Sequence, residues 1–139
     1  MRFMMLVMIP NSEDEADWAP SAEDVGKMTK YNEELTKAGV LLALDGLHPS
    51  SKGARVSFSD GKGTVTDGPF AEAKELVGGY WVIDVRTKDE AVQWASRCPM
   101  QDGAAIEVRQ VFEMSDFPPD VQEAAAELSQ TPPEQTTAR

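Results

Sequence analysis

Residues 78–90 read Gly78-Gly79-Tyr80-Trp81-Val82-Ile83-Asp84-Val85-Arg86-Thr87-Lys88-Asp89-Glu90, and they contain a strand followed by the start of a helix. The first part is rich in aromatic and β-branched residues, which favours a buried strand. Thr87 with Glu90 three residues later is a capping box, which predicts a helix start. Pro99 would end that helix. The inward-facing residues would be Ala91, Trp94, Ala95 and Cys98.

Residues upstream of this segment predict a strand, a helix and a second strand. Phe3 to Ile9 is an apolar run ended by Pro10, and we interpret it as a central strand buried on both faces. An acidic loop anchored by Trp18 follows. A helix over 22–38 is predicted by its cap and by an apolar stripe of Val25, Met28, Tyr31, Leu35 and Ala38. Residues 40–44 predict a second buried strand.

The remaining segments predict a hairpin, a last strand and a tail. Residues 54–58 and 63–66 flank a Gly-containing turn and are typical of a peripheral hairpin. Residues 105–112 predict the last strand. We therefore expect one domain over 1–115 and an acidic tail over 116–139, with a short helix and a disordered end at 131–139.

The predicted order is β-α-β-(hairpin)-β-α-β, which fits an α+β fold of the ferredoxin-like sandwich type. Right-handed crossovers would place both helices on one face of the sheet, against Trp81, Ile83, Val85 and, on the last strand, Ile106, Val108 and Phe112. The other face would mix charged and apolar side chains. A surface of that kind is usually covered by a partner, so we expect a homodimer packed sheet to sheet.

Bulk properties exclude several classes of protein. A net charge of −11 argues against direct partners such as nucleic acid or an anionic membrane surface. One cysteine, Cys98, rules out an intramolecular disulfide and a Cys-based zinc cluster. No apolar run approaches membrane-spanning length, and the apolar start lacks a cleavage site. A soluble cytoplasmic protein is expected.

A kinked polar connector, Thr66-Asp67-Gly68-Pro69-Phe70-Ala71-Glu72-Ala73-Lys74-Glu75, precedes Gly78-Gly79-Tyr80. This block resembles the signature of the DGPF branch of the YCII-related family. Residues 38–41, 46–49 and 108–109 are also similar to that branch. The resemblance covers about residues 1–114. It implies a ferredoxin-like fold of the dimeric α+β barrel type, no assigned reaction, and a link to extracytoplasmic-function sigma factors.

The sister YCII branch carries a proposed His–Asp acid–base pair. Its His would fall at Met28 and its Asp at Cys98, so that pair is not carried over to this chain. Whether the chain is an enzyme stays open. If it is one, it must use other groups.

Two residues are candidates for acid–base catalysis. Asp67, beside Gly and Pro, is a possible general base, although an Asx-type turn role is favoured. His48, the only histidine, is a possible proton shuttle, although a capping or solvent-facing role is favoured. No metal site and no cofactor are predicted, because only scattered carboxylates accompany that histidine.

Four residues are candidates for ligand binding: Tyr80, Asp84, Arg109 and Phe70. Arg109 could hold a carboxylate or phosphate, and the alternative is an interface ion-pair network with Asp84 and Glu107. Phe70 is expected to be a core or interface anchor, with ligand stacking as the alternative. Cys98 is expected to be inert.

Two functions follow as hypotheses. The first is a homodimeric domain that binds a small, anionic molecule in a cavity on the helix-free sheet face. The alternative is a protein-interaction or regulatory module that acts with a sigma factor.

Overall fold

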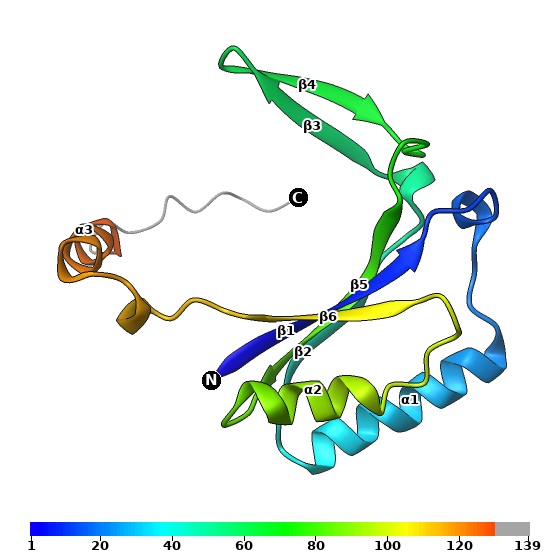
Figure 1. Ribbon diagram of the computed structural model, residues 1–139, viewed down its shortest axis with the longest axis horizontal. Helices are drawn as coiled ribbons and strands as arrows, with labels where there is room; N and C mark the ends of the chain where they lie inside the picture. Colours follow the sequence, from blue (N-terminus) through cyan, green and yellow to red (C-terminus); the bar gives the residue numbers. More distant parts are fainter. Residues whose placement is uncertain (130–139) are drawn as a thin grey trace.

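The computed structural model describes residues 1–129, and these form a four-stranded sheet, a separate hairpin and three α-helices (Figure 1). The strands of the main sheet are β1 (Arg2–Pro10), β2 (Leu41–Gly46), β5 (Glu75–Asp84) and β6 (Ala105–Gln110). The hairpin consists of β3 (Ala54–Ser59) and β4 (Lys62–Asp67). The helices are α1 (Ala22–Lys37), α2 (Lys88–Ser96) and α3 (Pro119–Ser129).

The sheet has the order β2-β5-β1-β6, and all of its neighbouring strands are antiparallel. Helices α1 and α2 both lie on one face of it (Figure 1). This is a ferredoxin-like α+β arrangement, as the sequence predicts. The caps also form as expected, because the Ser21 and Thr87 hydroxyls accept hydrogen bonds from the backbone N–H of Asp24 and Glu90.

The core lies between the sheet and the two helices. Tyr31 of α1 packs edge to face on Trp81 of β5, with ring centroids 5.6 Å apart. Both polar ends are satisfied: the Tyr31 hydroxyl donates to the Trp94 carbonyl at 2.6 Å, and the Trp81 indole donates to Asn32 Oδ1 at 2.8 Å. The other buried residues of this core are Phe3, Met5, Leu35, Ile83, Val85 and Ala91.

Several predictions about burial are wrong, including that of Val25 in the apolar stripe of α1, which is 50% exposed. The strand predicted over 40–44 is the edge strand β2, and Leu42 is 54% exposed. Phe112 lies beyond β6 and is 70% exposed, stacked on Phe117 instead of facing the helices. Trp18 is 55% exposed and does not anchor its loop. In each case the apolar side chain lacks a covering element within the described part of the chain.

Two parts of the chain leave the sheet at its opposite ends. The hairpin joins β5 near Pro10, whereas residues 111–129 leave from the other end of β1, where Val111 N–H donates to the Arg2 carbonyl at 2.9 Å. We call residues 111–129 the arm. Its short helix α3 lies away from the sheet (Figure 1). The predicted disorder at 131–139 lies outside the described residues.

Candidate functional site

The helix-free face of the sheet is organised in rows that run across the strands. The first row is Asp45, Tyr80, Leu6 and Glu107 on β2, β5, β1 and β6. The second row, two residues further along, is Ala43, Val82, Met4 and Arg109. Cross-strand partners point to the same face of a sheet, so apolar side chains lie at the centre and charged groups at the two edges.

The central polar contact joins Tyr80 to Asp45. The Tyr80 hydroxyl donates to Asp45 Oδ2 at 2.6 Å. This hydrogen bond raises the pKa of Tyr80, and the charge of the neighbouring carboxylate adds to the shift. The phenol is therefore held protonated, as a hydrogen-bond donor and acceptor, above the pH at which a free tyrosine ionises. Asp45 was not among the predicted site residues, because the second strand was predicted to end at residue 44, one residue before it.

The predicted cluster of Arg109, Asp84 and Glu107 divides into two separate contacts. Arg109 Nη1 donates to Glu107 Oε2 at 3.3 Å, and both side chains are largely exposed. Asp84 Oδ1 instead accepts from the N-terminal ammonium of Met1 at 3.0 Å. In the strand register, Asp84 of β5 lies opposite Arg2 of β1, and Arg109 of β6 lies opposite Met4 of β1. Strand β1 therefore separates the side chains of Asp84 and Arg109.

Asp67 and His48 lie at the base of the hairpin, outside the rows of the sheet face. We call this place the neck, where Gly68 N–H donates to the Gly53 carbonyl at 2.9 Å. Asp67 is the last residue of β4 and is exposed. Its carboxylate makes no side-chain hydrogen bond to another residue within 1–129. His48 is also exposed, in the loop between β2 and Ser50.

The neck contains a buried carboxylate that sequence reasoning missed. Glu15 is 6% exposed and accepts hydrogen bonds from both the backbone N–H of Ser50, at 2.7 Å, and its hydroxyl. Gly68 lies against the same residue, since a Cβ there would come within 1.8 Å of the Ser50 carbonyl oxygen. Four acidic residues occupy 13–17, and nothing in their order marks Glu15 as the buried one.

Phe70 is buried beside the neck, where it contacts the hairpin. It is 7% exposed, and the Arg55 guanidinium of β3 lies over its ring at 4.4 Å from the centroid. Asn11 supports the connector by donating to the carbonyls of Phe70 and Ala73 at 2.7 Å. The structure therefore brings Phe70 together with the hairpin, and it places this ring apart from Tyr80 and Arg109.

Comparison with known proteins shows the family of this chain. Residues 1–115 match the YCII-related domain. The chain belongs to the YCII-related domain family. An uncharacterised protein of Rhizobium meliloti (strain 1021) is 35% identical over 68 residues, which is 49% of this chain and 55% of that protein. The matched segment thus spans about half the length of this relative.

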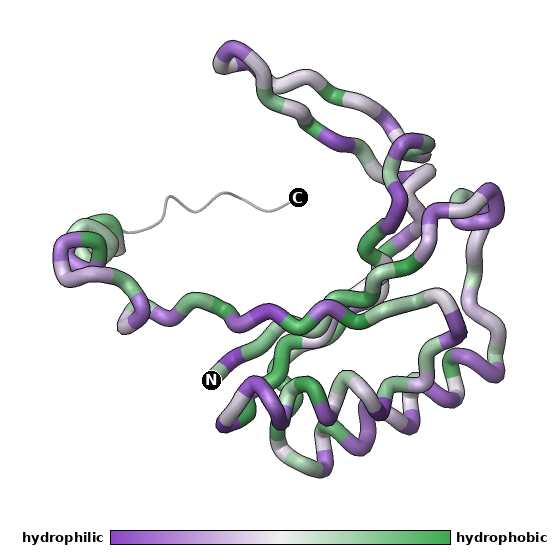
Figure 2. Tube along the Cα trace, in the orientation of Figure 1, coloured by the Kyte–Doolittle hydropathy of each residue, from purple (hydrophilic) through white to green (hydrophobic). Residues whose placement is uncertain are grey.

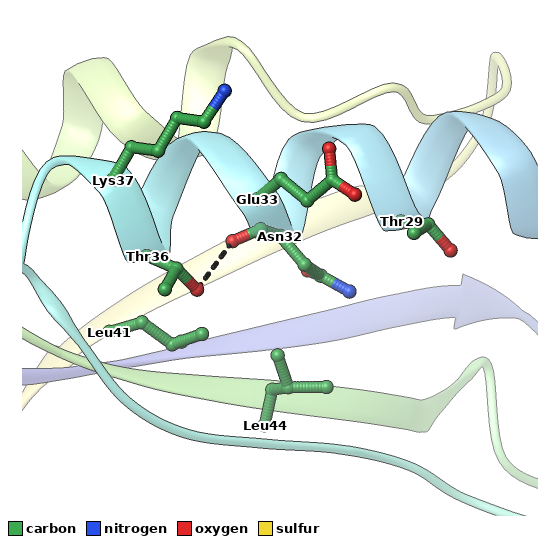
Figure 3. A pocket seen from close by; sticks show the side chains of 7 residues that line it. All are labelled: Thr29, Asn32, Glu33, Thr36, Lys37, Leu41 and Leu44. Atoms are coloured by element: carbon green, nitrogen blue, oxygen red, sulfur yellow. Dashed lines mark hydrogen bonds between the residues drawn. The ribbon is translucent and has the colours of Figure 1, made fainter.

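Two hollows of this YCII-related domain lie beside its helices, away from the predicted residues. One, of about 350 Å³, is lined by Thr29, Asn32, Glu33, Thr36 and Lys37 of α1 and by Leu41 and Leu44 (Figure 3). The charged ends of Glu33 and Lys37 point away from the two leucines (Figure 3). The other, of about 490 Å³, lies between α2 and β6 beside Cys98. Neither hollow is lined by both a candidate acid–base pair and a cationic side chain.

Within residues 1–129, no three His, Cys, Asp or Glu side chains gather in a way that could hold a metal ion. Burial raises the pKa of the Cys98 thiol to about 12, so this sulfur is a poor nucleophile near neutral pH. No helix among the described residues is both long and apolar enough to cross a membrane.

Proposed function

We propose that this YCII-related domain, of the DGPF branch, is a homodimer that binds a small molecule between the helix-free faces of two sheets. The observation that carries the proposal is the Tyr80–Asp45 hydrogen bond of 2.6 Å beside Leu6, Met4 and Val82. A few oriented polar groups within an apolar surface are typical of ligand sites.

The ligand would carry an anionic group for Arg109. The single contact of 3.3 Å from Nη1 to Glu107 leaves the other guanidinium N–H groups free to bind a carboxylate or phosphate. Arg109 lies one row along and two strands across from Tyr80. Strand geometry puts their Cα atoms about 12 Å apart. A ligand of several bonds' length could reach both.

The dimer is supported by the half-buried state of the central strand. Met4, Leu6 and Met8 are each partly covered within one chain, although β1 is a central strand. A second sheet packed at about 10 Å would cover these side chains and leave the charged edges at the rim. His48 and Asp67 would then lie at the rim of the cavity, near the Asp45 end of the first row.

A ligand screen tests the site directly. Thermal unfolding would be measured with small carboxylates, phosphorylated metabolites and amines, since a ligand at about 100 times its Kd adds near 3 kcal/mol to stability. A hit should be lost in Tyr80→Phe and in Arg109→Gln and kept in Arg86→Gln, which changes an exposed arginine off the sheet face. Equal binding by all three variants would contradict the proposal. Unchanged binding by His48→Asn would remove His48 from the site.

The alternative is an interaction module for a sigma factor. The observation in its favour is the exposed apolar surface of the hairpin, where Phe58 is 80% exposed. This role predicts no stabilisation by any compound in the screen and a stable complex with the sigma factor in size-exclusion chromatography.

A further inference from the structure

Helix α3 has an apolar stripe that the rest of residues 1–129 leaves partly exposed. Its apolar residues are Val121, Ala124, Ala125 and Leu128, at the spacing of one helical face. Val121 is 40% and Leu128 is 76% exposed. Glu123 lies opposite this stripe, and Asp120 and Glu127 flank it. A short helix of this kind is marginal alone and normally derives its stability from packing its apolar face.

The hairpin has an apolar face of matching character. Val56 pairs with Val65 and Phe58 pairs with Gly63, so these side chains share one face of the two-stranded sheet. Val56 is 52% exposed, Val65 is 65% exposed and Phe58 is 80% exposed. The other face carries Arg55, which stacks on Phe70, so the apolar face is directed away from the neck. An isolated two-stranded hairpin is also marginal in water.

In one chain these two surfaces are attached at opposite ends of the sheet. The hairpin joins the sheet at the Pro10 end of β1 and the arm leaves at the Arg2 end. Nine residues of strand separate those ends, a span of about 30 Å. Figures 1 and 2 show α3 and the hairpin projecting from opposite ends of the sheet, each with apolar positions of its own.

We propose that α3 of one protomer packs its apolar stripe on the Val56–Phe58–Val65 face of the hairpin of a second copy. The proposal rests on the homodimer described above. If the β1 strands of the two protomers run in opposite directions across the interface, the Arg2 end of one lies over the Pro10 end of the other. Two-fold symmetry then forms the same contact twice.

Charge favours this pairing over one with the rest of the surface. Residues 119–129 carry three carboxylates and no base, whereas residues 50–67 carry three bases and two acids in a chain of net charge −11. The hairpin segment is thus less acidic than the rest of the chain, so α3 meets less repulsion there, although Arg55 and Lys62 flank the apolar face from the other side of the two-stranded sheet.

Side-chain contacts also fix the direction of the arm where it leaves the sheet. Arg2 makes two hydrogen bonds to Glu113, of 2.6 and 3.1 Å, and Phe112 stacks on Phe117 at 4.9 Å between centroids. These contacts fix where residues 111–117 leave the sheet, so fewer conformations are lost when α3 docks. The arm beyond residue 115 lies outside the matched family domain, so the contact between α3 and the hairpin would be an addition to that domain.

Cross-linking between differently labelled chains tests the contact. In a Cys98→Ser background, Val121→Cys and Val65→Cys would be made separately, mixed, allowed to exchange, and treated with a short bismaleimide. We expect a cross-linked dimer in the mixture and none with either variant alone. The matched control is Glu123→Cys mixed with Thr64→Cys, on the polar sides of α3 and of the hairpin, which should stay uncross-linked.

The outcomes separate this contact from the homodimer itself. A third variant would carry Val121→Cys and Val65→Cys in the same chain. A link within one chain of this variant, with none in the mixture, would overturn the proposal because α3 would cover its own hairpin. If the parent protein sediments as a dimer and the mixture still gives no link, the contact between α3 and the hairpin would be overturned, and the homodimer would stand. A parent that sediments as a monomer would overturn both.

A second measurement does not depend on cross-linker geometry. Leu128→Asp should raise the dimer dissociation constant about tenfold or more, because each dimer loses two buried apolar contacts. Glu127→Gln, its neighbour on the polar side, should change that constant by about twofold or less, as surface substitutions do. Equal effects of the two substitutions would contradict the docking of the apolar stripe.

Discussion

The Tyr80 hydroxyl and the Asp45 carboxylate lie 2.6 Å apart on neighbouring strands of the helix-free face. Ionising the phenol would break this hydrogen bond and place two negative charges side by side, so the pKa of Tyr80 is raised. Asp45→Asn should lower that pKa toward the ordinary value of 10.0. The measurement is an ultraviolet titration of phenolate absorbance.

Tyr31, the other tyrosine, serves as an internal reference in this titration. Its pKa is also raised, chiefly by burial, and Asp45 is not among the causes. Tyr80→Phe should remove the phase that responds to Asp45→Asn and leave the other unchanged. A titration curve that is the same with and without the Asp45 carboxylate would show that the hydrogen bond is absent in solution.

Gly68→Ala should destabilise the protein by about 2 kcal/mol or more, because overpacking against backbone forces it to shift. The added Cβ would come within 1.8 Å of the Ser50 carbonyl oxygen. Gly26→Ala in α1 is the matched control, since a Cβ there meets nothing within 4 Å. It should instead stabilise the helix by about 1 kcal/mol. Urea unfolding measures both, and equal effects would refute the close approach at the neck.

The Arg2–Glu113 pair should make stability depend on acid pH. Its hydrogen bonds lower the pKa of Glu113 below the ordinary 4.5, so the pair stabilises the fold above that pH. The stabilisation is lost as the pH falls through the lowered pKa of the folded state. Glu113→Gln should therefore reduce Tm at pH 7, and the difference from the parent should vanish in acid.

A double-mutant cycle separates this pair from unrelated effects of each substitution. Arg2→Gln should reduce Tm at pH 7 as Glu113→Gln does, and the double variant should lose little more than either. Fully additive losses would mean that the two side chains do not interact.

Cys98 should react slowly with a thiol reagent such as DTNB at pH 8. Burial raises its pKa to about 12, so almost no thiolate is present at that pH. Unfolding in urea should restore fast labelling of the single thiol, which supplies the control within one sample. Equal rates in the folded and unfolded protein would contradict the half-buried position of Cys98 just after α2.

Local patterns predicted much of the fold. The alternation of Trp81, Ile83 and Val85 identified the helix-facing side of β5, and all three are buried. The hydroxyls of Ser21 and Thr87 marked both helix starts because capping involves residues only three apart. The hairpin was equally readable, since Asp60 and Gly61 form its turn with positive φ values of 53° and 75°.

Features that depend on distant partners were not predictable in the same way. The burial of Glu15 requires Ser50, and the Tyr80–Asp45 contact requires the pairing of β2 with β5, each 35 residues apart in sequence. The run over 40–44 is as apolar as a central strand, yet it forms an edge. An apolar sequence indicates that the side chains are stabilised by burial, but it does not indicate whether residues of the same chain or of another chain bury them.

The neck also bears on how the chain can be altered. Gly53 and Gly68 are joined by a 2.9 Å backbone hydrogen bond, so the hairpin enters and leaves the domain at a single point. Because the two ends of the hairpin are adjacent, the hairpin can be lengthened, shortened or exchanged at its Asp60–Gly61 tip without changing the strand spacing of the main sheet. The tip is thus a permissive position for inserting an epitope or a fluorophore.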